Sequence, residues 1–183
     1  MQKALLISSM LLAILFFAGV IVTYLANMIL APSIMTPRKI VPEILKSMNL
    51  KKGVKLIDLG SGDGRIIIGA VKLYNAKVVG YEISPILAML SRLLKITKTG
   101  LKGSYEIKSD SIFRADLKGI DIVYCHLNEK AMKPLVKKLK QELQDNAKVF
   151  TFHYQFPEIK ESAKHLLSNG DLVYEYSAKA LQK

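Results

Sequence analysis

The sequence has a single cysteine, no tryptophan and one long stretch without any charged residue. Because Cys125 is the one cysteine, an intrachain disulfide is excluded, which agrees with a reducing compartment. No cluster of cysteine and histidine has the spacing of metal ligands, since His126, His153 and His165 are separated, so no metal site is predicted. The chain of 183 residues is long enough for one domain with a substantial core.

Charge is absent from Ala4 to Pro37, and the part of this stretch up to Ala31 is almost continuously apolar. About 20 apolar residues in a helix span the hydrocarbon core of a bilayer, so residues 1–31 are predicted to form a retained transmembrane anchor. The alternative is a cleaved signal peptide, but the run is longer than a secretory apolar core and no small-residue cleavage site clearly ends it. Prolines then predict a linker, residues 32–37, before a domain of residues 38–183.

Acidic residues are few, 15 against 27 basic ones, and all charged residues except Lys3 follow the apolar run. Positive charge is retained on the cytoplasmic side of a membrane, so a single-pass protein with its domain in the cytoplasm, or in the matrix of a mitochondrion, is predicted. A basic domain is drawn to anionic lipid headgroups, although a solvated lysine surface without a partner is equally compatible. The lysines are scattered, with no arginine-rich or aromatic-interleaved stretch, so no nucleic acid partner is expected.

Short apolar runs alternate with helical patterns in the domain. Strands are predicted near residues 54–59, 76–81, 104–109, 120–125 and 147–153, and helices near 40–49, 64–74, 85–99 and 129–143. This alternation is typical of an α/β domain with a mostly parallel sheet. Residues 158–167 fit a helix or a strand, and residues 171–178 alternate like a strand. Because Asn169-Gly170 between them is a turn signal, a closing antiparallel hairpin is favoured.

A glycine-rich loop follows the first predicted strand, within VKLIDLGSGDGR from Val54 to Arg65. Ligands of open α/β sheets bind beyond the carboxyl ends of the strands, where Gly60 and Gly62 let the backbone turn and approach a ligand closely. A dinucleotide site would need a small residue where Arg65 stands. The G-x-G-x-G spacing, with Asp58 two residues before it, favours S-adenosylmethionine, because a carboxylate suits the ammonium group of that molecule.

Two further acids follow the neighbouring predicted strands. Glu82 ends the second strand, where a carboxylate can accept hydrogen bonds from both ribose hydroxyls. Asp110 follows the third strand and can accept one from the adenine amino group, although both acids also suit surface turns. The predicted cofactor-binding residues are therefore Asp58, Gly60, Ser61, Gly62, Glu82, Asp110 and Ser111.

These acids and glycines resemble those of the class I S-adenosylmethionine-dependent methyltransferases. The resemblance covers most of residues 50–153. It implies a Rossmann-like, mostly parallel sheet of seven strands in the order 3-2-1-4-5-7-6, with strand 7 antiparallel.

The apolar N-terminus, the proline-containing linker and DLGSGDGRIIIGA together resemble a narrower family, the membrane-anchored protein-lysine methyltransferases. Its members include the enzymes that act on the adenine nucleotide translocase and on the ATP synthase c-subunit. The similarity continues through Asn128 to residues 148–157. Thr36-Pro37 match the end of the family's leading motif, P-Y-V-P-[ST]-P, while Ser33 and Met35 differ from it. The resemblance implies N-methylation of lysine in membrane-associated proteins.

Methyl transfer to nitrogen is an in-line displacement, which requires alignment of nucleophile, carbon and sulfur. A lysine nucleophile must first lose its proton. Candidate residues for this site are Thr36 in the linker and His126 and Asn128 after the fourth strand, although His126 also suits a packed strand end, and the catalytic base stays open. Two other functions are compatible with the sequence: a small-molecule or lipid methyltransferase, and a non-catalytic S-adenosylmethionine-binding module.

Overall fold

The computed structural model describes residues 2–30, 35–98 and 105–182, and the chain folds as two compact units, residues 1–33 and 34–183. The first unit is a single helix, α1 (Gln2–Leu30), whose large apolar side chains from Leu6 to Val22 are 50–69% exposed. The sequence predicts a membrane-spanning segment here. Among the described residues, no helix is both long enough and apolar enough to cross a membrane. The predicted linker begins outside the described residues, and its division from the domain stays a prediction.

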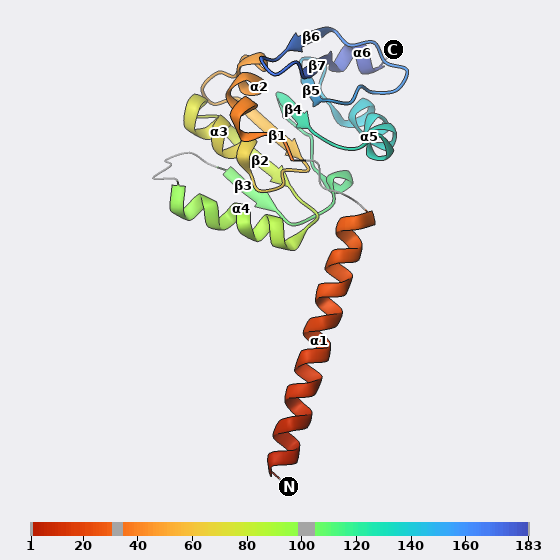
Figure 1. The fold of residues 1–183 in the computed structure, drawn as a ribbon. Coiled ribbons are helices and arrows are strands. Elements are labelled where there is room, and N and C mark those ends of the chain that lie inside the picture. Colours follow the sequence, from red (N-terminus) through yellow and green to blue (C-terminus); the bar gives the residue numbers. More distant parts are fainter. Residues whose placement is uncertain (1, 31–34, 99–104, 183) are drawn as a thin grey trace. The chain divides into compact units, whose positions relative to one another are not determined.

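The second unit is built on one seven-stranded sheet (Figure 1). The strands are β1 (Lys55–Leu59), β2 (Lys77–Tyr81), β3 (Tyr105–Lys108), β4 (Ile122–Cys125), β5 (Lys148–Phe152), β6 (Ala163–Leu166) and β7 (Leu172–Ser177). Their order is β3-β2-β1-β4-β5-β7-β6, and β7 runs antiparallel to both of its neighbours while the pairs among β1 to β5 are parallel. This confirms the predicted α/β class, the strand order and the closing antiparallel hairpin.

Helices cover both faces of the sheet (Figure 1). They are α2 (Val41–Ser47), α3 (Arg65–Tyr74), α4 (Pro85–Lys98), α5 (Glu129–Glu142) and α6 (Ala178–Gln182), with 3-10 turns η1 (Arg38–Ile40) and η2 (Ile112–Arg114). The first four agree with the sequence prediction. The sequence did not predict α6, because five residues are too few to show a helical period.

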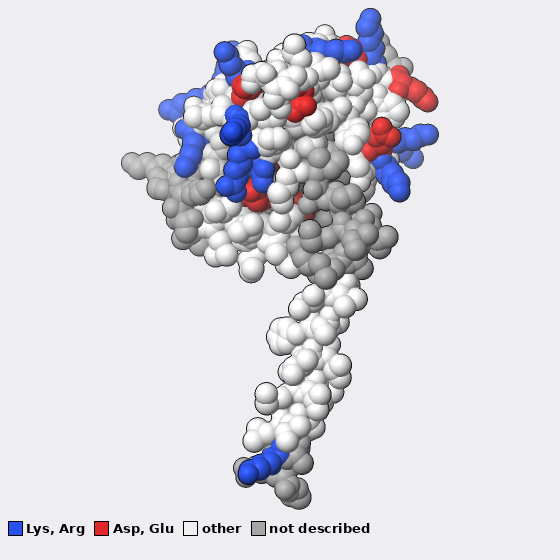
Figure 2. Space-filling model, viewed as in Figure 1, with Lys and Arg blue, Asp and Glu red and all other residues white. Residues whose placement is uncertain are grey.

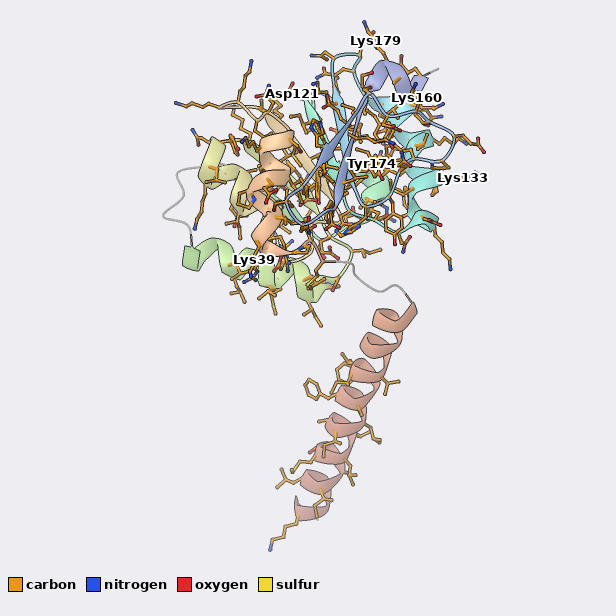
Figure 3. All side chains as sticks on the ribbon, turned by 45° about the horizontal axis from the view of Figure 1, so that its top comes forward. Lys39, Asp121, Lys133, Lys160, Tyr174 and Lys179 are labelled. Atoms are coloured by element: carbon orange, nitrogen blue, oxygen red, sulfur yellow. The ribbon has the colours of Figure 1, made fainter. Side chains whose placement is uncertain are left out.

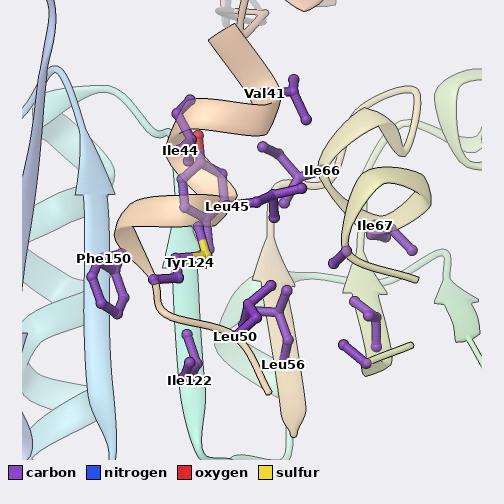
Figure 4. Close-up of a cluster of buried hydrophobic side chains, with 14 of the residues drawn as sticks. Val41, Ile44, Leu45, Leu50, Leu56, Ile66, Ile67, Ile122, Tyr124 and Phe150 are labelled. Carbon is purple, nitrogen blue, oxygen red and sulfur yellow. The ribbon is translucent and has the colours of Figure 1, made fainter. Parts of the chain in front are cut away.

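The core has two layers, one on each face of the sheet. Successive strand residues point to opposite faces, so Tyr124 packs in the layer of α2 and α3 while Val123 packs in the layer of α5. Figure 4 shows Ile44 and Leu45 of α2 close to Tyr124. Because both faces are covered, the central strands are mostly apolar, which is why their sequences show runs rather than alternation.

Leu45 offers a test of this packing, since its side chain is fully buried in the core layer of α2 and α3 and lies against Gly69. Leu45→Ala should lower the free energy of unfolding by about 2–5 kcal/mol, because a buried cavity replaces the lost side chain. Leu73→Ala, on the 58% exposed side chain of α3, is the matched control and should change it by no more than about 0.5 kcal/mol. Urea unfolding measures both, and equal effects would contradict the burial of α2.

Candidate functional site

The glycine loop turns directly after β1 and is fastened to β2. The amides of Gly60 and Ser61 both donate to the carbonyl oxygen of Tyr81, at 2.9 and 3.0 Å. Gly62 has a φ of +55°, and a Cβ atom placed on it would meet no atom within 4 Å. The backbone at Gly62 therefore faces open space, in a conformation that favours glycine. Ser61 is 6% exposed, and its hydroxyl has no hydrogen-bond partner among the described residues.

Glu82 lies where the sequence predicts it, just beyond β2 and facing the glycine loop. Glu82 is 7% exposed, and its two carboxylate oxygens accept hydrogen bonds from the backbone amides of Gly62 and Ser84, each at 2.8 Å. Each oxygen keeps further lone pairs, so the carboxylate can still accept from hydroxyl groups of a ligand. Two hydrogen bonds from backbone amides thus hold this buried carboxylate beside the loop.

Asp58 is a second buried carboxyl group, 2% exposed in β1 between Gly80 of β2 and Tyr124 of β4. Burial, with smaller contributions from the charges of Glu82 and Asp63, raises the pKa of Asp58 to about 8. The cause is that burial removes the water that would stabilise the ionised form, and the neighbouring carboxylates repel it. A cationic group bound beside Asp58 would supply the missing charge.

Asp110 and Ser111 follow β3 at the same edge of the sheet, since the amide of Glu82 donates to the carbonyl of Lys108 at 3.0 Å. Asp110 accepts from the amide of Ser111 at 2.7 Å and pairs with Arg114 at 3.3 Å. Ser111 caps the turn η2. Asp110 and Ser111 therefore form a turn, which is one of the two roles that the sequence allows for Asp110. This turn follows β3, the strand next to β2, so it lies near Glu82 at the end of β2.

The polar groups present fit S-adenosylmethionine. Buried carboxylates suit its ammonium group and its ribose hydroxyls. The open space over Gly62 leaves room for a ligand close to the backbone, and the Ser61 hydroxyl, which lacks a hydrogen-bond partner among the described residues, is available to that ligand. Asp58 and Glu82, from neighbouring strands, are brought together at the carboxyl edge of the sheet, where open α/β sheets bind their ligands.

Two of the three candidate methyl-transfer residues also meet. The Thr36 hydroxyl lies 3.0 Å from Nδ1 of His126 and 3.2 Å from the hydroxyl of Tyr124, and Thr36 is 5% exposed. Asn128 does a different task, because its side chain caps α5 by accepting from the amide of Ala131 at 3.1 Å. Tyr124 was missed from the sequence, where it reads only as one apolar member of a buried strand.

His126 is held as a neutral imidazole. Burial, aided by His153, lowers its pKa to about 4, and its ring stacks on His153 with centroids 5.4 Å apart. Its Nε2 atom is buried and has no partner in the described part of the chain. A neutral imidazole can form hydrogen bonds through both ring nitrogens at physiological pH without carrying charge.

A charge cluster fastens Thr36 to the glycine loop. Arg65 donates to both oxygens of Asp63, at 2.7 and 2.8 Å, and Arg38 donates to Asp63 at 3.0 Å. Arg65 also donates to the carbonyl oxygen of Thr36 and contacts the sulfur of Met35. Although burial alone would raise the pKa of Asp63, these two guanidinium groups lower it. Sequence reasoning noted Arg65 only as a misfit to a dinucleotide motif and missed Asp63 and Arg38.

A separate groove of about 840 Å³ lies beside α5, and Lys133, Lys160 and Lys179 contribute to its lining (Figure 3). Its lining includes Ser177, which pairs with Lys148, the first residue of β5. The groove therefore lies toward the amino ends of the parallel strands, away from the site described above.

Several known proteins are similar in sequence to this chain. A family profile described as the ANTKMT methyltransferase domain matches residues 58–163. The human lysine N-methyltransferase of the ATP synthase c-subunit is 30% identical over 174 residues, which cover 94% of this chain and 72% of that protein. A protein-lysine N-methyltransferase of Saccharolobus islandicus (strain REY15A) is 32% identical over 125 residues, covering 68% of this chain and 77% of that protein.

A solved structure extends the comparison to the fold. An RNA methyltransferase from Salinibacter ruber, crystallised in complex with S-adenosyl-L-homocysteine, superposes with a TM-score of 0.74 at 28% identity, covering 79% of this chain and 94% of that one. S-adenosylmethionine is accordingly the cofactor of this fold. The chain belongs to the family of the ANTKMT methyltransferase domain and is an S-adenosylmethionine-dependent methyltransferase.

Proposed function

We propose that this enzyme transfers the methyl group of S-adenosylmethionine to lysine side chains of membrane-associated proteins. The observation that carries the proposal is the cluster of Thr36, Tyr124 and His126 next to the carboxyl edge that holds Asp58 and Glu82. A cofactor site and a polar acceptor site thus adjoin on one sheet. The names of the human and archaeal relatives, both lysine N-methyltransferases, support lysine as the acceptor.

In this proposal each predicted cofactor residue has one task. Glu82 accepts from the ribose hydroxyls, and Asp58 balances the positive charge of the ammonium group. The backbone of Gly60, Ser61 and Gly62 lies against the ligand. Asp110 and Ser111, at the next strand end, face the adenine.

The acceptor must arrive as a neutral amine. Its nitrogen lone pair then forms the new bond to carbon as the bond from carbon to sulfur breaks, which leaves S-adenosylhomocysteine. A partly desolvated pocket favours loss of the lysine proton before attack. Because its pKa is lowered to about 4, His126 is too weak a base to hold a lysine proton, and its task in this proposal is to orient the acceptor, with Thr36 contacting its Nδ1 atom.

The membrane part of the proposal rests on the N-terminal segment. The apolar, charge-free run extends in the sequence from Ala4 to Ala31, and its last residue lies outside the described residues. Large apolar side chains that α1 exposes to water would be stabilised by lipid. We therefore assign residues 4–31 as the anchor of a single-pass protein whose basic domain faces the cytoplasm or the mitochondrial matrix, beside anionic headgroups.

The competing acceptors are a lipid, a small molecule and RNA, the last because the Salinibacter ruber relative is named an RNA methyltransferase. A non-catalytic binding module is a further alternative. Each gives a distinct product or none, so one labelling experiment separates them.

Asp58→Asn tests the uncompensated charge. Because folding raises the pKa of Asp58 from 3.8 to about 8, the ionised form opposes folding, and stability is lost as the pH rises through that interval. The variant should therefore gain stability over the wild-type protein between pH 4 and 8, with a slope of no more than about 1.4 kcal/mol per pH unit, and no further above pH 8. Chemical denaturation across this range measures the difference. Parallel stability curves would contradict the assignment.

Glu82→Gln keeps the shape of the side chain and removes its charge. Each charge-assisted hydrogen bond to a ribose hydroxyl contributes roughly 1.5–3 kcal/mol, so the Kd for S-adenosylhomocysteine should rise at least about tenfold. Glu106→Gln, at an exposed position of the adjacent strand β3, is the matched control and should leave the Kd unchanged. Titration calorimetry measures both. An unaltered Kd for Glu82→Gln would show that the ribose partner lies elsewhere.

Membranes incubated with the enzyme and radiolabelled S-adenosylmethionine should yield label in integral membrane proteins, on lysine. Removing residues 1–33 should lower activity on these targets more than activity on a soluble lysine peptide, because the anchor confines the site near the bilayer. The fragment must retain Thr36, which packs into the domain.

Protein, lipid and RNA fractions are counted separately, followed by amino-acid analysis of the protein. Label confined to lipid, RNA or a small metabolite would reject lysine as the acceptor. No transfer at all, in a protein that binds the cofactor, would favour the binding module.

A further inference from the structure

The outer face of α4 is apolar and exposed. Its side chains, together with the preceding Ile83, recur at helical spacing and are strongly exposed: Ile83 73%, Ile86 45%, Met89 55%, Leu90 41% and Leu93 51%. A surface helix of a soluble protein ordinarily turns such residues inward and keeps polar ones outside. A continuous apolar stripe on the outside therefore indicates a surface that something covers.

The inner face of the same helix is made of small residues. Ala88 and Ser91 are completely buried, and Ser91 packs so closely on the glycine loop that a Cβ atom on Gly64 would lie 2.1 Å from its hydroxyl. The larger side chains therefore point outward because the helix approaches the domain through its small ones. The exposed stripe follows from the packing and is not a displaced part of the core.

Basic residues accompany this stripe. Arg92 is exposed on α4 and donates one hydrogen bond to the carbonyl oxygen of Ile107 at 2.8 Å. Arg114 is 77% exposed in η2, where it pairs with Asp110 at 3.3 Å and follows Phe113, which is 44% exposed. In Figure 2 the surface over the first half of α4 carries no blue or red atoms, while lysines and arginines gather above it on the same domain. An apolar stripe with basic flanks complements an anionic lipid surface, with acyl chains under the stripe and phosphates at the flanks.

The chain between the two units is short. Residues 31–37 span at most roughly 23–25 Å when fully extended. If α1 is anchored as proposed above, some face of the domain must lie close to the bilayer. The α4 stripe has apolar side chains that can enter it.

The stripe also begins at the candidate cofactor site. Ile83 stands between Glu82, whose carboxylate holds the glycine loop, and Ser84, whose amide donates to that same carboxylate. Docking α4 on lipid would therefore set the carboxyl edge of the sheet at the membrane surface.

From these observations we propose that the α4 stripe inserts into the boundary between headgroups and acyl chains of an anionic membrane. This second lipid contact, which rests on the proposed anchoring by α1, orients the active site toward lysines at the bilayer surface. A second copy of the chain or an apolar protein partner would cover the same stripe without lipid.

The test uses the full-length chain in vesicles of phosphatidylcholine and phosphatidylglycerol. Met89→Cys places a thiol on the stripe, and Leu166→Cys, 73% exposed on β6 at the far edge of the sheet, is the matched control. Each is labelled with a fluorophore, while Cys125 is buried and escapes labelling. Brominated phospholipids should quench the label at position 89 and leave the label at position 166 unquenched.

Absence of quenching at position 89 in vesicle-bound protein, or equal quenching at both positions, would overturn the α4 proposal while leaving the α1 anchor intact. A label at position 89 that is shielded from aqueous iodide but unquenched by lipid would also overturn it, in favour of a protein partner. Protein that does not float with the vesicles would overturn both membrane proposals, whatever the methyl acceptor.

A second measurement separates orientation from catalysis. The double variant Met89→Ser and Leu90→Ser should lose activity on a vesicle-embedded lysine target by on the order of tenfold or more, because two apolar side chains no longer enter lipid. Its activity on a soluble lysine peptide should be unchanged. Leu166→Ser should alter neither, and equal losses on both substrates by the double variant would contradict an orienting role.

Discussion

Asp63 accepts hydrogen bonds from Arg65 and from Arg38, and the segment around Thr36 depends on this charge cluster. A carboxylate that is 5% exposed would be costly without partners, and two guanidinium groups supply them. One of these groups, Arg65, then reaches the carbonyl of Thr36. The glycine loop, the start of α3 and the segment before α2 are thereby ordered together, and the Thr36 hydroxyl is presented to His126 and Tyr124.

Two buried carboxyl groups near one loop have opposite electrostatics. Two guanidinium groups lower the pKa of Asp63, whereas burial and the neighbouring carboxylates raise the pKa of Asp58 to about 8. The first carboxylate serves the structure. The second is destabilising until a cation arrives, which is the usual conflict between stability and function at a binding site. In the function proposed above, the positively charged cofactor would resolve that conflict by binding beside Asp58.

Thr36 also changes how the N-terminal part of the chain is understood. Residues 32–37 read as a linker in the sequence, yet Thr36 is buried and hydrogen-bonded to the domain. Met35 is one of the two positions at which this chain differs from the family's P-Y-V-P-[ST]-P motif, and its sulfur contacts Arg65.

The sequence by itself determined the sheet, the closing hairpin, the glycine loop and the positions of Asp58 and Glu82. These features depend on local patterns and on the rule that parallel strands bring their carboxyl ends to one edge. The hydrogen bond of Thr36 to His126 joins residues 90 positions apart, and Arg65 reaches back 29 positions to Thr36. No periodicity encodes such contacts, and only the tertiary structure decided them, because they form when separately folded segments pack against one another. The outward direction of the α4 stripe was decided in the same way, since the small side chains of Ala88 and Ser91 fit against the domain and the large ones do not.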